Sequence, residues 1–293
     1  MSREGTQDLP RIDLPARAAM SIDVEDWFQV QNLAQRVSRD SWDSREQRVV
    51  ANTTRMLSML EESGARATCF VLGWVAERHP GLVRDIASAG HEVASHGYGH
   101  ELIYEIGPDR FRDDVRRAKG ILESITGSPI EGYRAPNFSI TDWALDVLLE
   151  EGHAYDSSSF PVVAHDRYGR LSNSPRGRCA YQPRPGIDEV CVSSLRIGGK
   201  DIPWGGGAWF RLFPYPIFAW GAERILRSGK PLVFYIHPWE IDAGQPRIGG
   251  LRWSHARRHY TNLAACGPRW LRLLKSRPWC TIRDLRAGAT RVG

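Results

Sequence analysis

Cysteine pairs and long apolar segments are both missing from this sequence. Its five cysteines are an odd number and none forms a Cys-x-x-Cys pair, which argues against a disulfide framework and favours reduced thiols. Met1 to Arg17 is largely polar and lacks the apolar core of a signal peptide. No apolar run approaches the roughly 20 residues that span a bilayer. We therefore predict a cytoplasmic protein with no stable membrane insertion.

Long blocks of like charge are missing too. The 293 residues carry a net charge of +5, but the longest basic runs are pairs such as Arg116-Arg117. This distribution indicates no nucleic-acid partner. With 42% hydrophobic and 25% charged residues, the composition is typical of a globular protein with a large core.

Strand-like and helix-like segments alternate along most of the chain. This alternation predicts an α/β fold in which parallel strands are joined by right-handed crossovers. We expect a flexible lead-in at residues 1–16 and one domain at residues 17–289. Residues 159–188, rich in Pro, Arg, Ser and Gly, are expected to form a long surface excursion.

The expected elements follow from hydrophobic periodicity and from helix start and stop residues. The expected strands are Ala18–Val24, Ala67–Leu72, His91–Ser95, a strand ending at Tyr133–Pro136, Ala154–Ser158, Val190–Ile197, Leu232–Ile236 and Cys280–Leu285. The expected helices are Arg45–Ser63, Gly81–Ala89, Arg110–Ile125, Thr141–Glu151, Pro216–Ser228 and Thr261–Lys275. Asp242–Arg257 is expected to be a loop.

An acidic cluster ends the first expected strand. Asp23, Glu25 and Asp26 are close enough in sequence to repel one another, and a cation would relieve that repulsion. Such acids can supply a hard metal ligand and a general base. The alternative is a solvated turn in which Asp26 caps a helix.

A pair of histidines follows another expected strand. His96 and His100 are four positions apart, a spacing that puts both imidazoles on one side of a helical turn, where they can share one ion. Their neighbours Ser95, Gly97 and Gly99 are small and let backbone or ligand approach. We predict that both histidines bind a metal ion.

Two further polar residues lie at expected strand ends. A buried Arg134 could hold a catalytic carboxylate through a two-pronged hydrogen bond, although an ordinary surface arginine fits the local sequence equally well. His237 could donate a proton to a leaving group or simply pack in the core. Candidate residues thus fall repeatedly at the carboxyl ends of strands, where barrels and open α/β sheets bind ligands.

Together these residues resemble the polysaccharide deacetylase family, also called carbohydrate esterase family four. The resemblance covers roughly residues 18 to 285 and implies a distorted, TIM-like (β/α) barrel with about seven parallel strands. It also implies a divalent metal cofactor, usually Zn²⁺, and removal of N-acetyl groups from amino sugars. The matching motifs, in family order, are Ser21–Asp26, His96–His100, Arg134-Ala135-Pro136, Tyr155-Asp156-Ser157-Ser158 and Tyr235-Ile236-His237.

Other segments resemble a subgroup of that family, the deacetylases found with bacterial exopolysaccharide and PEP-CTERM/exosortase loci. The subgroup implies an N-acetylated glycan as partner, either a bacterial polysaccharide or its precursor. These segments are Asp23–Phe28, Gly205–Arg211, His237–Glu240 and His259–Leu263.

The resemblance also implies roles for single residues. Asp23 matches the family's base and His237 its acid. Arg134 would steer Asp23, and Asp156 would orient His237. Aromatic side chains would grip sugar rings, the substrate-binding candidates being Trp209, Trp239 and Tyr133, with Trp204 also near the motifs.

The metal ligands implied by the family are His96, His100 and a carboxylate. The family carries a second Asp directly after the base, whereas Val24 stands at that position here. The carboxylate is therefore Glu25 or Asp26. Glu25 is two residues beyond Asp23 and points to the same side of an extended chain, which favours it slightly.

Two other functions stay open at this point. The same barrel could hydrolyse a small cyclic amide, or it could be a non-catalytic carbohydrate-binding module. The presence of Asp23, both paired histidines and His237 argues against a binding module, because a binder needs no general acid. The sequence identifies neither the glycan, nor the metal, nor the oligomeric state.

Overall fold

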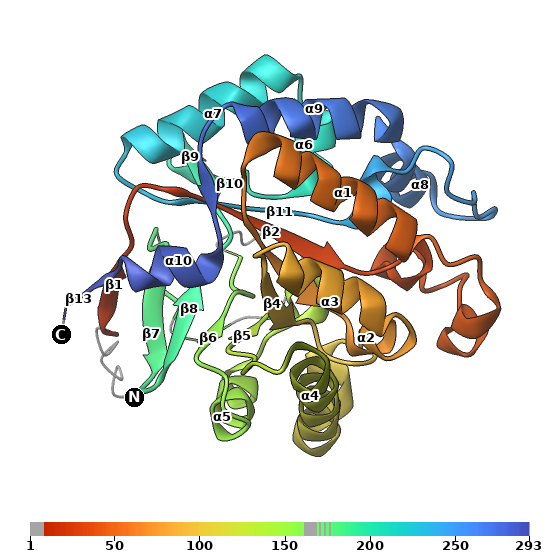
Figure 1. The fold of residues 1–293 in the computed structure, drawn as a ribbon. Coiled ribbons are helices and arrows are strands. Elements are labelled where there is room, and N and C mark those ends of the chain that lie inside the picture. Colours follow the sequence, from red (N-terminus) through yellow and green to blue (C-terminus); the bar gives the residue numbers. More distant parts are fainter. Residues whose placement is uncertain (1–8, 161–168, 170, 173, 176, 293) are drawn as a thin grey trace, which may run out of the picture.

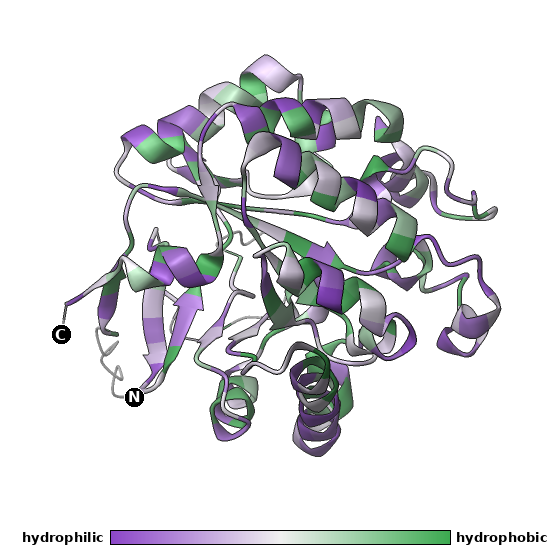
Figure 2. Ribbon diagram, in the orientation of Figure 1, coloured by the Kyte–Doolittle hydropathy of each residue, from purple (hydrophilic) through white to green (hydrophobic). Residues whose placement is uncertain are grey.

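The computed structural model describes residues 9–160, 169, 171–172, 174–175 and 177–292. In this part of the chain one curled, mostly parallel sheet occupies the middle of the molecule, and helices surround it (Figure 1). The helices carry both hydrophobic and hydrophilic residues (Figure 2). This is expected of helices that pack one side against a sheet and expose the other. No helix among the described residues has the length and apolar character to cross a membrane.

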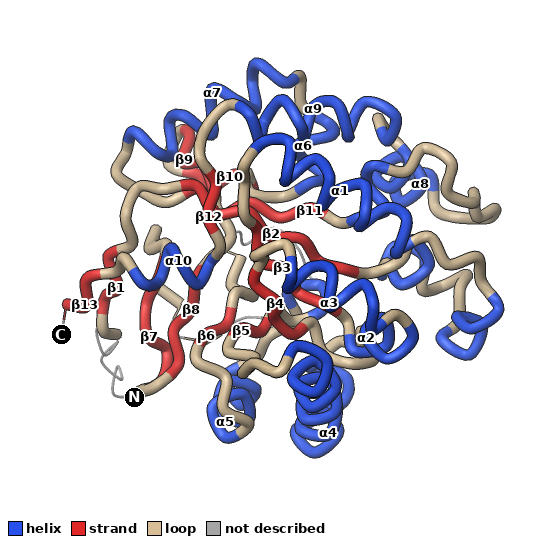
Figure 3. The backbone as a smooth tube through the Cα atoms, viewed as in Figure 1, coloured by secondary structure: helices blue, strands red, loops and turns tan. Residues whose placement is uncertain are grey.

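The sheet confirms the predicted distorted barrel in a single α/β domain. From β11 to β8 all neighbouring strands are parallel, whereas β7, β1 and β13 add antiparallel strands. Figure 3 shows these last three strands at one end of the sheet. The strands in sheet order are β11 (Leu232–Ile236), β2 (Ala18–Val24), β3 (Ala67–Val71), β4 (Glu92–Ser95), β5 (Gly132–Tyr133), β6 (Tyr155–Asp156), β8 (Ile187–Val190), β7 (Ala180–Arg184), β1 (Arg11–Asp13) and β13 (Thr290–Val292). In addition β12 (Trp279–Cys280) pairs with β2, and β9 (Ser194–Ile197) with β10 (Lys200–Pro203).

The helices cover the outside of the sheet. They are α1 (Val49–Ser63), α2 (Gly73–Arg78), α3 (Pro80–Ser88), α4 (Ile103–Thr126), α5 (Asp142–Glu150), α6 (Gly207–Leu212), α7 (Tyr215–Arg227), α8 (Trp253–Tyr260), α9 (Leu263–Lys275) and α10 (Ile282–Ala287). Short 3₁₀ turns are η1 (Trp27–Gln29), η2 (Gln31–Leu33), η3 (Arg39–Ser44), η4 (Pro136–Phe138) and η5 (Pro238–Ile241).

Helix α1 shows how the sequence produces these elements. Val49, Met56 and Leu60 recur at helical spacing and are completely buried, so one stripe of the helix packs into the core. Gly64 ends the helix with a φ of 67°, in the left-handed region that glycine adopts without a steric penalty. Its N–H donates to the carbonyls of Leu60 and Glu61.

Some predicted boundaries are wrong because distant segments pair with each other. The lead-in predicted at residues 1–16 includes Arg11–Asp13, which form β1 between β7 and β13; residues 1–8 lie outside the described residues. The excursion predicted at 159–188 includes β7 and the start of β8, joined through Gly186 with a φ of 96°. Residues 161–168, 170, 173 and 176 lie outside the description.

Three local predictions also need correction. The strand predicted at Val190–Ile197 is divided, because Val190 ends β8 and Ser194 begins β9. Of the strand predicted at Cys280–Leu285, Cys280 lies in strand β12, but helix α10 begins at Ile282, since Thr281 Oγ1 accepts a hydrogen bond from Asp284 N at 2.9 Å and caps the helix. The loop predicted at Asp242–Arg257 contains the first turns of α8.

The parallel register brings the expected site residues to one edge. Ile236 pairs with Ile22, Val24 with Val71, and Val71 with Ser95, so the carboxyl ends of β11, β2, β3 and β4 lie side by side. The residues that follow these ends therefore meet in space.

Candidate active site

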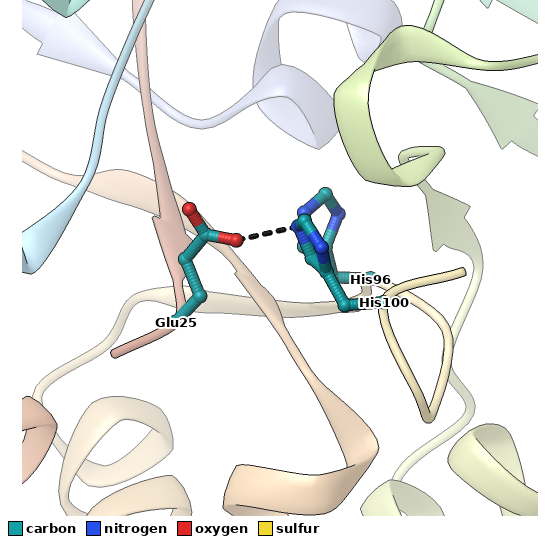
Figure 4. A group of neighbouring side chains, drawn as sticks. All are labelled: Glu25, His96 and His100. Atoms are coloured by element: carbon teal, nitrogen blue, oxygen red, sulfur yellow. Dashed lines mark ion pairs between the residues drawn. The ribbon is translucent and has the colours of Figure 1, made fainter. Parts of the chain in front are cut away.

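Glu25, His96 and His100 converge at this edge of the sheet. Their side chains point toward one another in Figure 4, and one ligand atom of each lies within 4.8 Å of the others. Glu25 Oε2 is 2.6 Å from His100 Nε2. All three side chains are buried. Two imidazoles and a carboxylate are a donor set typical of zinc sites.

A loop, and not the predicted helical turn, brings the two histidines together. Gly97 and His100 both have positive φ values, 69° and 55°, which fold the chain back between the imidazoles. Asp114 of α4 fixes this loop by accepting hydrogen bonds from Tyr98 N and Gly99 N, both at 2.8 Å. The sequence spacing alone contains no sign of that support.

His96 has one ring nitrogen left for a ligand. Its Nδ1 bonds the carbonyl oxygen of Arg134 at 2.8 Å, so Nε2 faces the cluster. Burial lowers the pKa of His96 to about 4. The imidazole is therefore neutral near pH 7, as a metal ligand must be.

Glu25, rather than Asp26, is the acid that lies beside the histidines. Asp26 accepts hydrogen bonds from the backbone N–H groups of Trp27, Arg48 and Val49 at 2.8, 2.7 and 3.0 Å. It caps η1 and fixes the entry to α1, which agrees with the capping role in the alternative interpretation, but Asp26 is buried and the turn is not solvated there.

The pKa and the surroundings of Glu25 also fit a residue that binds a cation. Burial alone would raise its pKa, but the neighbouring charges of His100 and His237 outweigh burial and lower the pKa to about 2. Trp239 Nε1 donates to Glu25 Oε1 at 3.2 Å, and the buried Oε2 faces His100 Nε2 at 2.6 Å. An ionised, buried carboxylate beside two imidazoles fits a metal ligand.

Asp23 and Arg134 form a second buried unit beside the cluster. Arg134 is completely buried, and its Nη1 donates to Asp23 Oδ1 at 2.7 Å and to Ser21 Oγ at 2.8 Å. Its Nε and Nη2 donate to the carbonyl and the hydroxyl of Ser157 at 3.0 and 2.9 Å. The guanidinium thus holds one Asp23 oxygen in place from a fixed position.

His237 lies across from these acids. Its Nε2 is 3.5 Å from Glu25 Oε1 and 3.9 Å from Asp23 Oδ2, while its Nδ1 bonds Glu240 Oε1 at 2.8 Å. Burial would lower the pKa of His237, but the charges of Glu25, Glu240 and Asp23 raise it to about 9. The imidazole is accordingly protonated near neutral pH.

Glu240 takes the place that the sequence prediction gave to Asp156. Glu240 bonds His237 and accepts a hydrogen bond from the completely buried Arg211 at 2.7 Å. Asp156 instead accepts from Ser158 Oγ at 2.5 Å and pairs in register with Glu189, and burial raises the pKa of both carboxyls. In the described structure His237 therefore bonds Glu240, and not Asp156 as the resemblance implied.

The aromatic candidates divide between core and cleft. Tyr133 is 1% exposed, packs edge-on against Phe111 and is not among the residues that line the cleft. Neighbouring side chains on a strand point to opposite faces, and Arg134 takes the site-facing side. Trp204 is also buried, with Nε1 donating to the carbonyl of Phe218.

The two other tryptophans differ from each other. Trp239 lines the cleft and stacks on His237 at 5.2 Å, supporting the site as well as facing it. Trp209 stacks on Phe213 and is not among the residues that line the cleft.

A small cleft of about 80 Å³ gives access to these groups. The sequence prediction missed several of its residues: Arg211, Glu240, Asn137 and Arg258. A carboxylate three positions after His237, inside His237–Glu240, was the one available sign of Glu240. The cleft is lined by Asp23, Glu25, Val30, Gln31, Asn32, His96, His100, Asn137, Phe138, Ala208, Arg211, Tyr235, His237, Trp239, Glu240 and Arg258.

Two family models match the chain. Residues 40–155 match "Polysaccharide deacetylase", and residues 157–287 match "Domain of unknown function (DUF3473)". The first model covers both paired histidines and Arg134, and the second covers Arg211, His237 and Glu240. Asp23 and Glu25 precede both matches and are placed in the site by the fold.

Curated relatives match part of the chain. A peptidoglycan-N-acetylglucosamine deacetylase from Bacillus cereus is 28% identical over 134 residues, which are 41% of this chain and 49% of the relative. A peptidoglycan deacetylase from Helicobacter pylori is 30% identical over 120 residues, 41% of this chain and 41% of the relative. The chain thus matches about half the length of these relatives or less.

A solved structure matches nearly the whole chain. The crystal structure of a candidate polysaccharide deacetylase from Mycobacterium smegmatis has a TM-score of 0.62 and 20% sequence identity, covering 98% of this chain and 92% of that one. The chain thus shares its fold with this structure, and its residues 40–155 are similar to the polysaccharide deacetylase family.

Proposed function

We propose that this chain is a metal-dependent carbohydrate N-deacetylase that hydrolyses the acetamide of an N-acetylated amino sugar. The observation that carries the proposal is the placement of the Glu25, His96 and His100 cluster between two other units. On one side is Asp23 held by Arg134, and on the other is His237 held by Glu240. A base, a metal site and an acid around one cleft are the parts that amide hydrolysis needs.

The metal would be held by Glu25, His96 and His100. Bound there, a divalent ion supplies Lewis acidity, which lowers the pKa of water and polarises the acetamide carbonyl. Zn²⁺ is our choice, because neutral imidazoles and one carboxylate are its usual ligands in catalytic sites.

The protein's own residues perform the proton transfers. Arg134 occupies Asp23 Oδ1, so Oδ2 is the oxygen that takes the proton of the attacking water. Glu240 holds His237 Nδ1, so Nε2 presents its proton to the cleft. His237 gives this proton to the amino-sugar nitrogen as the C–N bond breaks and acetate forms.

We further propose a bacterial exopolysaccharide or its precursor as the substrate. The support is the resemblance of the Asp23–Phe28, Gly205–Arg211 and His237–Glu240 segments to deacetylases of PEP-CTERM/exosortase loci. The geometry adds a reason why these three segments would occur together in one protein. Arg211, Glu240 and His237 form one hydrogen-bonded chain beside Asp23.

The alternative functions have less support. A non-catalytic carbohydrate-binding barrel has no use for the Asp23–Arg134 and His237–Glu240 pairs, which are buried or partly buried around one cleft. A hydrolase of small cyclic amides would use the same groups. Substrate tests distinguish it from a glycan deacetylase.

The deciding experiment measures acetate release and metal content on the same sample. Purified protein would be incubated with N-acetylated oligosaccharides and, separately, with small cyclic amides. We expect about one divalent ion per chain and acetate from at least one glycan. Metal-loaded protein that opens a cyclic amide but releases acetate from none of the glycans would overturn the proposal.

His237 as proton donor leads to a prediction that depends on the leaving group. We expect His237→Ala to lower turnover of an N-acetylglucosamine oligosaccharide roughly 10²-fold or more, because the amine leaves poorly without a proton. The loss on an activated acetyl ester should be much smaller, because that leaving group needs little protonation. Rates on both substrates would be compared in the same preparation.

A partly exposed histidine provides the matched control. His79→Ala, between α2 and α3, should leave both rates near those of the wild type. Equal losses on amide and ester in His237→Ala would mean that His237 positions the substrate or the oxyanion instead. A large fall in melting temperature would mean that it mainly packs the core.

A further inference from the structure

One charged side chain in the cleft, that of Arg258, has no hydrogen-bond or ion-pair partner among the described residues. Asp23 is bound by Arg134, Glu25 lies beside His100 and His237, and Arg211 is paired with Glu240. Arg258 also lines the cleft, and it is half-buried, yet its guanidinium makes no hydrogen bond or ion pair with any described residue. The cleft thus contains a cation whose counter-ion the described chain does not supply.

The segment that carries Arg258 has no acidic residue. Between Asp242 and Asp284 there is no Asp or Glu, whereas arginines occur at positions 247, 252, 257, 258, 269, 272, 277 and 283. Helix α8, which carries Arg258, contacts η2, and Gln31 and Asn32 of that turn line the same cleft. Of the arginines nearby in sequence, Arg258 lines the cleft, and the other arginine that lines it, Arg211, is paired with Glu240.

The backbone of Arg258 is fixed to the catalytic groups. Arg211 Nη2 donates to the carbonyl of Arg258 at 3.0 Å, and Arg211 Nη1 donates to the carbonyl of His259 at 3.1 Å. The same guanidinium binds Glu240, which holds His237. The end of α8 therefore has a defined position relative to the proton donor, as a substrate-binding residue requires.

We propose that Arg258 binds an anionic group of the substrate, a carboxylate or a phosphate, next to the N-acetylated sugar. The inference rests on the proposed deacetylase function and narrows it to acidic glycans or phosphate-linked amino sugars. A guanidinium presents a planar fork of donors that matches both oxyanions, and such charge-assisted pairs discriminate strongly against neutral ligands. Partial burial strengthens the pair, because screening by water is weaker there.

The test compares three substrates in the metal-loaded protein. They are a neutral chitotetraose, a tetrasaccharide of alternating N-acetylglucosamine and glucuronic acid, and UDP-N-acetylglucosamine. We expect kcat/KM on one of the two anionic substrates to exceed that on chitotetraose roughly tenfold or more. In Arg258→Gln that preference should disappear. The anionic substrate that is preferred identifies the group as carboxylate or phosphate.

Arg257→Gln is the matched control. Arg257 lies on the same helix but is exposed and packs over the Trp253 ring at 5.2 Å. The Arg257→Gln variant should keep the wild-type preference for the anionic substrate, because it leaves the contact of Arg258 with the anionic group in place. Loss of the preference in both variants would mean a general effect of positive charge and would overturn the proposal. A wild-type protein without preference for either anionic substrate would overturn it as well.

A binding measurement separates this inference from the proposed function. Calorimetry with Asp23→Asn protein, with and without Arg258→Gln, measures affinity for the same three ligands without turnover. If no substrate yields acetate, the deacetylase proposal fails, and the Arg258 site is judged by affinity alone. Tighter binding of an anionic ligand that Arg258→Gln abolishes supports the site, and equal affinities in both proteins refute it.

Discussion

Asp23→Asn is expected to lower acetate release on the order of 10²-fold or more while the protein keeps its metal. The amide has nearly the same shape as the carboxylate. Its oxygen can still accept a hydrogen bond from Arg134 Nη1, which lies 2.7 Å from Asp23 Oδ1 in the wild-type structure. It cannot take a proton from water at neutral pH. Because Glu25, His96 and His100 are unchanged, metal content should match that of the wild type.

Initial rates and metal content per chain would be measured on the same preparations. Asp85→Asn, the same change at an exposed site on α3, is the control and should alter neither quantity. If Asp23→Asn lost its metal and Glu25→Ala retained it, the roles given to Asp23 and Glu25 would be reversed. If Asp23→Asn kept most of its activity, another group would have to be the base.

The sequence was most informative where a buried strand ends in a polar residue. The expected strands Ala18–Val24 and Leu232–Ile236 are the observed β2 and β11, because mainly apolar runs in a parallel sheet are buried on both faces. Parallel strands also end at one edge. The convergence of Asp23, His96 and His237 could therefore be predicted without knowing any distance.

Support for the site was less predictable, because it comes from segments far apart in sequence. Asp114 holds the loop of the paired histidines from α4, and Arg211 holds Glu240 from α6. Neither contact has a local spacing that marks it. The choice between Asp156 and Glu240 as the partner of His237 likewise depends on whether η5 forms a tight turn, which periodicity does not report.

Aromatic residues were the least reliable guide to substrate contacts. Tyr133 and Trp204 belong to the core, and Trp239 bonds Glu25 while it faces the cleft. Large aromatic side chains contribute most to burial, so their presence near a motif is a weak indication of ligand binding. By contrast Arg258, which nothing in the motifs singled out, lies in a stretch of sequence, residues 243–283, that contains no Asp or Glu.

Replacing both paired histidines should have the largest effect on the metal. We expect the double variant His96→Ala, His100→Ala to lose metal affinity by at least about 100-fold, since even loss of a residue that only orients a ligand costs 10–100-fold. Acetate release should fall with it, because Asp23 and His237 alone cannot activate water. Metal content after dialysis would be measured beside activity. Full occupancy in the double variant would refute the metal site.

Single substitutions of Glu25 and Asp26 then test which carboxylate binds the metal together with the two histidines. Glu25→Ala should lose the metal, because it removes the carboxylate that lies 2.6 Å from His100 Nε2. Asp26→Ala should keep the metal but unfold at lower temperature, because three backbone N–H groups lose their acceptor, a cap worth about 1–2 kcal/mol. The opposite pattern, with metal lost in Asp26→Ala and kept in Glu25→Ala, would move the ligand to Asp26. The cluster of Glu25 with the histidines would then be a buried ion pair rather than a metal site.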